Sequence, residues 1–316
     1  MFAVDAGSNQ LSLFDIADNG SLRLTDVVSS GGVGPVSVTV ADDVAYVLNA
    51  GDRTVSGFRI GGGSLVGIAG STQALPGNGG AQVSFDRTGR RLLVTEKATS
   101  TIDVLAVRAG VAQPAVSTAS SGQTPFGFAI DQRNHVIVSN AAGGAPGASS
   151  LTSYALTGTA LSPISAAVPD TQSAACWVVL AGRGRYAYTT NTGSGTVSSY
   201  RVGADGTLTL AQAVAATTGT APIDASVVAG YLLTLNSGSH AISADGGEVD
   251  RTLSLSGPGA EPTRGVGLSS VRPWPWPGGD PRGLATPEPT AFATRRTLLL
   301  YSLQAHHIRA GSRPNA

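Results

Sequence analysis

A short pattern recurs across most of the chain and constrains the fold more than any other feature. Each copy ends a run of strand-forming residues in a small polar turn, as in AYVLNAGDRTVSGF from Ala45 and YAYTTNTGSGTVSSY from Tyr186. Intervals of 44, 47, 44, 51 and 45 residues separate the residues that close these runs, which are Asp5, Asn49, Glu96, Asn140, Asn191 and Asn236. A repeat in the forties with several strands in each copy is typical of β-propeller blades.

Each full repeat is predicted to contain four strands. In the copy from Pro125 these strands are PFGFAID, HVIVSN, SSLTSYAL and ALSPISAAV. The turns carry Gly or Asn where a positive φ is needed, as in ADNG at Ala17 and DRTG at Asp86. No segment keeps a 3.6-residue apolar period over three turns, which excludes a helical solenoid.

The repeat also sets the expected boundaries. The strands of the first blade should lie within residues 1–30, where the chain opens at the second strand of a unit. Further repeats should begin near residues 31, 76, 122, 171 and 220. The segment EPTRGVGLSS (261–270) resembles a first strand, and pairing it with residues 1–30 would close six blades and cover exposed sheet edges. We therefore expect one all-β propeller domain over residues 1–270.

The composition changes after this domain. Residues 258–316 hold nine of the 17 prolines. The run VRPWPWPGGDPRG cannot lie inside a sheet, because proline lacks the donor for a ladder hydrogen bond. We interpret residues 271–316 as an irregular tail, rich in Pro and Arg, that is either poorly ordered or the product of a frameshift. In the second case the chain would be an inactive, truncated propeller.

Charge and cysteine content exclude several classes of function. The formal net charge is zero, so nothing indicates binding to nucleic acid or to an anionic membrane. Cys176 is the only cysteine, which excludes an internal disulfide and a multi-cysteine metal site. No run of about 18 apolar residues predicts a membrane span, and no signal peptide opens the sequence. We expect a monomer without a metal or another cofactor.

With its repeats aligned, the chain resembles the YVTN-repeat, lactonase-like seven-bladed β-propellers, and most closely an exported subgroup of them. The segments that carry the resemblance are LLVTEKATSTIDVL from Leu92, TPFGFAID from Thr124, SNAAGGAPGASSLTSY from Ser139 and AACWVVLAGRGRYAYTTNTGSGTVSSYRV from Ala174. The resemblance covers about residues 1–243. It implies a further blade and a signal peptide upstream of Met1, hence an extracytoplasmic protein, whereas closure by residues 261–270 implies six blades. The sequence is compatible with both alternatives.

In a propeller, the loops after the second and fourth strands of each blade surround one mouth of the central channel, where a ligand is expected. Glu96 is the candidate catalytic residue, because it places an acid where most copies have Asn. The candidate ligand-binding residues are Lys97, Arg53, Asn49, Asn140, Asn191 and Phe126. Plainer interpretations are a local ion pair between Glu96 and Lys97, asparagines that cap their own turns, and a core position for Phe126. Cys176 is interpreted as a buried thiol beside Trp177.

Two functions are predicted from these residues. The first is a non-catalytic scaffold that binds a small ligand or a protein partner on a rigid ring. The second is a lactonase acting on sugar-acid lactones, for which the resemblance implies His, Glu and Arg side chains around the channel. That constellation is not visible, since His135 is expected on the opposite face and His240 in a degenerate repeat. Convergence of Glu96, Lys97 and Arg53 within hydrogen-bonding reach would favour the lactonase.

Overall fold

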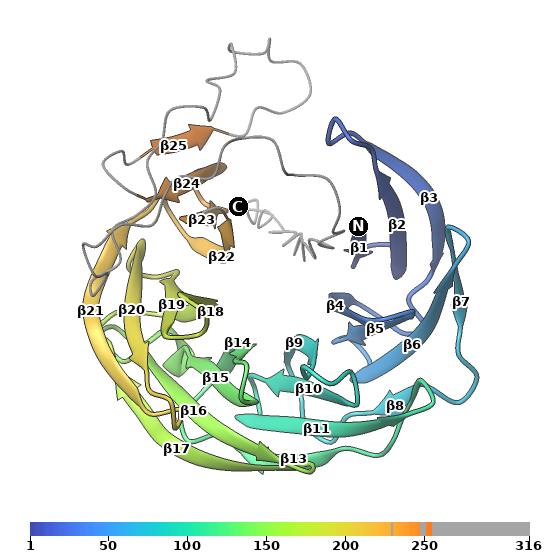
Figure 1. Cartoon of the computed structure of the whole chain (residues 1–316), viewed down its shortest axis with the longest axis horizontal. Coiled ribbons are helices and arrows are strands. Elements are labelled where there is room, and N and C mark those ends of the chain that lie inside the picture. The colour runs from blue at the N-terminus through green and yellow to red at the C-terminus, as the bar shows by residue number, and fades with distance from the viewer. Residues whose placement is uncertain (229, 247–250, 255–316) are drawn as a thin grey trace, which may run out of the picture. The chain divides into compact units, whose positions relative to one another are not determined.

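The computed structural model describes residues 1–228, 230–246 and 251–254, which form six antiparallel sheets (Figure 1). In a complete sheet, four strands lie side by side in the order in which they occur in the chain. In the second and third sheets the fourth strand is divided into two short strands. This confirms the all-β class and the four-stranded repeat. Within the described residues the helical structure is one 3-10 turn at Ala142–Gly144, and no helix is long and apolar enough to cross a membrane. The predicted closing strand (261–270) and tail (271–316) lie outside the described residues.

The first compact unit comprises Met1–Val94 and Leu105–Ala115. Within the described residues, its first sheet consists of three strands, β1 (Phe2–Asp5), β2 (Gln10–Ile16) and β3 (Leu22–Ser29). The second sheet contains β4 (Pro35–Ala41), β5 (Val44–Asn49), β6 (Thr54–Gly61), β7 (Ser64–Gly67) and β8 (Gln73–Ala74). The third sheet contributes residues to both units and contains β9 (Gly80–Phe85), β10 (Arg91–Glu96), β11 (Thr101–Arg108), β12 (Val111–Ala112) and β13 (Val116–Ala119).

Alternating apolar side chains of these strands build the core of the first unit. Tyr46 on β5 is fully buried, and its ring packs edge-on against Phe85 of β9 at 5.9 Å between centroids. The Tyr46 hydroxyl donates to the Gly110 carbonyl oxygen (2.8 Å) and accepts from the Ala112 N–H (2.7 Å). A buried aromatic ring therefore fixes the turn between β11 and β12 against the second sheet.

The second unit comprises Thr95–Val104 and the residues from Val116 onward, described here to 254. Its fourth sheet contains β14 (Pro125–Ile130), β15 (His135–Asn140), β16 (Ser150–Thr157) and β17 (Ala160–Pro169). The fifth contains β18 (Ala175–Ala181), β19 (Tyr186–Asn191), β20 (Thr196–Val202) and β21 (Leu208–Thr217). The sixth contains β22 (Pro222–Val228), β23 (Tyr231–Asn236), β24 (Ala241–Asp245) and β25 (Arg251–Ser254).

The first strands of these three sheets, β14, β18 and β22, follow one another side by side (Figure 1). Each begins with a β-bulge, a device that bends a strand and redirects its side chains. Close approach of β14 and β18 requires glycine, because a Cβ on Gly127 would lie 2.6 Å from the Cys176 carbonyl oxygen. The bulged segments leave Phe126, Trp177 and Asp224 only partly buried, on neighbouring strands.

Candidate functional site

The asparagines that close the second strands are held by a recurring set of hydrogen bonds. The Asn49 amide Nδ2 donates to the hydroxyls of Thr54 and Ser56 on the next strand, both at 3.3 Å. The same pattern joins Asn140 to Ser150 and Thr152, and Asn191 to Thr196 and Ser198. The three asparagines are at most 1% exposed.

This arrangement corrects the expectation that these asparagine side chains cap their own turns. The amides tie the second strand of a blade to the third, because each can donate to two hydroxyls on one face of the sheet. The packing is tight: a Cβ on Gly122 would lie 2.2 Å from Asn140 Cγ. Ligand binding by Asn49, Asn140 and Asn191 stays a prediction, since their amides lie inside the sheets.

The third repeat replaces the asparagine and one hydroxyl by two carboxyl groups. Glu96 takes the asparagine position at the end of β10, and Asp103 stands on β11 where the other repeats have Ser or Thr. Their side chains are 1% and 0% exposed. Glu96 Oε2 accepts from the Thr101 hydroxyl at 3.1 Å, and Asp103 Oδ1 accepts from the Ser117 hydroxyl.

We infer that the two carboxyl groups share a proton. Glu96 Oε1 and Asp103 Oδ2 are buried and have no hydrogen-bond partner among the described residues. Two neighbouring carboxylates repel, whereas one proton makes one group a donor and the other its acceptor. Burial, and then the Asp103 charge, raise the pKa of Glu96 to about 7, and burial also raises the pKa of Asp103. The Glu96 side chain is therefore buried inside the sheet and held there by its polar neighbours.

This shared proton predicts a pH-dependent stability. The pKa of Glu96 is about 7 in the folded chain, whereas the ordinary value of 4.5 applies in the unfolded chain. The folded state therefore binds the proton more tightly than the unfolded state. The stabilisation is complete below pH 4.5 and is lost as the pH rises to about 7. We expect Glu96 to contribute a loss of about 3 kcal/mol to urea unfolding over this interval, and Glu96→Gln, which keeps a donor at any pH, to remove that part, while the part that comes from Asp224 remains. Asp18→Asn, in an exposed turn, is the control; equal pH dependence in wild type and Glu96→Gln would contradict the shared proton.

Lys97 follows Glu96 in the sequence, but its side chain contacts different residues. Its Nζ lies 4.6 Å from the centroid of the Phe126 ring at the start of β14, a cation–π contact. Among the described residues it forms no ion pair, so the predicted pair with Glu96 is not present. Burial lowers the pKa of Lys97, and a favourable interaction with Cys176 opposes this shift. A partly buried ammonium without a counter-ion favours binding of an anion.

The neighbouring strands add a thiol and a carboxyl group. Cys176 is buried, as predicted, and its Sγ contacts the Ile223 carbonyl oxygen at 3.5 Å. Burial raises the pKa of Cys176 to about 12, so the thiol is neutral and not a nucleophile at neutral pH. Asp224 on β22 is partly buried, and burial raises its pKa to about 7, opposed by the Ala225 N–H that donates to its Oδ1 at 2.7 Å. Cys176 lies on β18, which packs against β14 on one side, where Phe126 lies, and against β22 on the other, where Asp224 lies.

Arg53 lies in the first unit, whereas Lys97 and Phe126 lie in the second. It stands exposed in the turn between β5 and β6, with a positive φ of 58°. Its carbonyl oxygen accepts from the Leu75 N–H at 2.8 Å.

The described residues contain no group of three His, Cys, Asp or Glu side chains that could hold a metal ion. The candidate site residues of the second unit are therefore Lys97 and Phe126, which contact each other, and Asp224 on β22.

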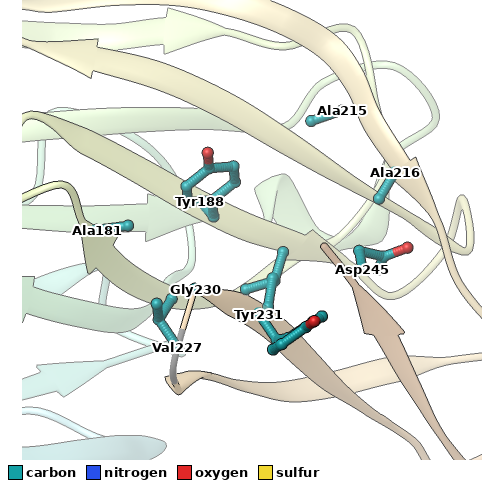
Figure 2. Close-up of a pocket in the computed structure, with 9 residues that line it drawn as sticks. Ala181, Tyr188, Ala215, Ala216, Val227, Gly230, Tyr231 and Asp245 are labelled. Atoms are coloured by element: carbon teal, nitrogen blue, oxygen red, sulfur yellow. The ribbon is translucent and has the colours of Figure 1, made fainter. Parts of the chain in front are cut away.

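A cavity elsewhere in the second unit is too small for a sugar lactone. Figure 2 shows it between Tyr188 and Tyr231, with Ala181, Val227 and Asp245 nearby. Its volume is about 30 Å³, room for only one or two water molecules, whereas ligand pockets usually exceed about 300 Å³.

Comparison with known proteins gives one family match and several similar solved structures. Residues 1–145 match the family model described as Lactonase, 7-bladed beta-propeller. No curated protein matches the chain. Similar solved structures include "putative 6-phosphogluconolactonase" proteins of Bacteroides fragilis (18% identity, TM-score 0.64, covering 74% of this chain and 72% of that one) and Bacteroides uniformis (17%, 0.65, 78% and 78%). A functionally unknown protein of Desulfotomaculum acetoxidans has 14% identity and a TM-score of 0.64, with 76% and 77% covered.

At these identities the solved structures establish the fold. They agree with the repeat of four-stranded sheets and with the family match over the first 145 residues. The chain is therefore an all-β protein of the propeller fold, and its resemblance to the lactonase-like seven-bladed propellers is confirmed.

Proposed function

We propose that the chain binds small sugar acids and their lactones at the surface formed by Lys97, Phe126 and Asp224, and that it hydrolyses the lactone. The observation that carries the proposal is the partly buried Lys97 ammonium on the Phe126 ring; it and the partly buried Asp224 carboxyl have no ion-pair partner among the described residues. Environments that shift the pKa values of such groups toward neutrality are typical of functional sites. The family match and the names of the similar structures support lactones as the ligand class.

Recognition follows from the charge and shape of the site. The Lys97 ammonium is held over the Phe126 ring and is free to bind a carboxylate or a polarised carbonyl oxygen. The partly buried Trp177 and Phe126 offer ring faces against which the carbon face of a sugar can pack. The aldonic acid and its lactone therefore use the same cation, one through its carboxylate and the other through its carbonyl.

Hydrolysis needs a base for water and a donor for the developing oxyanion. The Asp224 carboxylate accepts a proton from a water molecule, whose oxygen forms a bond to the lactone carbonyl carbon. Lys97 stabilises the negative charge on the carbonyl oxygen. The bond between this carbon and the ring oxygen then breaks, and the ring oxygen takes the proton back from Asp224. With a pKa of about 7, Asp224 can both accept and return the proton near neutral pH.

The test is a pH-stat assay of the purified chain with gluconolactone and 6-phosphogluconolactone, paired with calorimetric titration of gluconate. The proposal predicts gluconate binding and lactone turnover above the spontaneous rate. Gluconate binding without turnover would contradict the hydrolysis and leave the predicted non-catalytic scaffold. Absence of both would contradict the proposal as a whole.

A further inference from the structure

The first unit contains a polar cleft that the proposed lactone site does not use. It lies where the turns after β4, β9 and β11 meet the end of β6, and its volume is about 690 Å³, within the range of small-molecule sites. Val44, Phe85 and Val107 provide apolar lining, and Arg59, Arg90 and Arg108 provide three guanidinium groups. All of these residues belong to the first unit, whereas Lys97 and Asp224 belong to the second.

The charges of the cleft are only partly compensated. Arg59 Nη1 donates to Asp43 Oδ2 at 2.8 Å. The guanidinium groups of Arg90 and Arg108 have no carboxylate partner within the described part of the chain. Only Asp42 and Asp43 line the cleft as acids, so three cations face two anions. Cations gathered in one cleft repel one another, and an anion placed between them removes that repulsion.

Two glycines keep the cleft open beside these cations. Gly110 has a φ of +83°, and a Cβ there would lie 3.1 Å from Arg59 Nη2. Gly89 has a φ of +67°, and a Cβ there would lie 3.1 Å from the Ala41 Cβ. Both positions combine a backbone conformation that glycine adopts freely with little room for a side chain.

We propose that this cleft binds a small organic anion, a carboxylate or a phosphate, that carries an apolar body. Arg90 and Arg108 hold the anion, since a guanidinium pairs with carboxylate or phosphate oxygens through two parallel hydrogen bonds. Val44, Phe85 and Val107 contact the apolar body. Arg59 is a weaker contributor, because Asp43 already engages it.

Calorimetric titration of the full chain with phenyl phosphate and benzoate tests the proposal. Inorganic phosphate, which lacks the apolar body, and benzyl alcohol, which lacks the negative charge, are the control ligands. At least one aromatic anion should bind, and the one that binds tighter identifies the head group. Arg90→Gln with Arg108→Gln should weaken that binding by about tenfold or more. Arg87→Gln removes the same type of charge from the same turn but outside the cleft lining, and should leave the affinity unchanged.

Asp43→Asn should change the anion affinity in the opposite direction to the double arginine variant, and a loss of folding could not produce tighter binding. The substitution releases Arg59 from its ion pair, so anion binding should tighten by about threefold or more. Equal binding of benzyl alcohol or of inorganic phosphate would overturn the proposed combination of charge and apolar body. Equal loss in Arg87→Gln and in the double variant would overturn the site itself.

Discussion

Replacing Asp224 with asparagine is expected to lower kcat for gluconolactone by at least about 100-fold, the lower range for loss of a general base. Asparagine keeps the size of the side chain and can still accept from the Ala225 N–H, but it cannot take a proton from water. Because the substrate is bound by Lys97 in this account, KM should change little. The measurement is initial rate against lactone concentration, corrected for spontaneous hydrolysis.

Asp205→Asn is the matched control for this prediction. Asp205 is an exposed carboxylate of the same unit, in the turn between β20 and β21. Its loss should leave kcat within about twofold of wild type. If Asp224→Asn retained a third or more of the wild-type kcat, Asp224 would not be the base.

Replacing Lys97 with methionine is expected to weaken gluconate binding by about 10- to 150-fold, the range for one hydrogen bond to a charged group. Methionine preserves an apolar contact with the Phe126 ring but removes the ammonium that faces the carboxylate. The loss should be largest at low ionic strength, because salt screens the attraction between the ammonium and the carboxylate. Calorimetric titration of wild type and variant with gluconate gives the ratio of Kd values directly.

Arg53→Met provides the charge-matched comparison. It removes one positive charge from an exposed turn of the first unit, at a residue that the sequence alone also nominated as a ligand contact. The affinity for gluconate should remain unchanged in Arg53→Met. An equal loss in the two variants would mean that net charge, and not the Lys97 ammonium, controls binding.

The sheets could be predicted because their signal is local and repeated. Every repeat has alternating apolar residues, turn glycines and a polar residue at the end of the second strand, which is enough to locate β5, β10, β15, β19 and β23. The role of the polar residue was harder to predict. Comparing the hydroxyl-bearing positions of the third strand between repeats would have revealed Asp103, the one acid among them, and with it the buried carboxyl pair of Glu96.

The candidate site could be predicted only in part. Lys97 and Phe126 were selected from sequence as separate candidates, but they are 29 positions apart, and only the packing of β14 brings the ring under the amine. Asp224 is a further 98 positions along, and its only signal is an acid inside the mostly apolar strand PIDASVV. Such contacts depend on how neighbouring strands pack and where their bulges lie, which a repeat pattern does not encode.

The central claim, that Lys97 is an unpaired cation at a ligand site, has a direct spectroscopic test. Lys97 is the only lysine of the chain, so selective labelling with ¹³C-lysine gives a single side-chain Cε signal. A pH titration of this signal should give a pKa for Lys97 below the ordinary lysine value, as its burial requires, and saturating gluconate should raise that pKa because a bound carboxylate stabilises the ammonium. An ordinary lysine pKa that gluconate leaves unchanged would contradict both the buried cation and its role in binding.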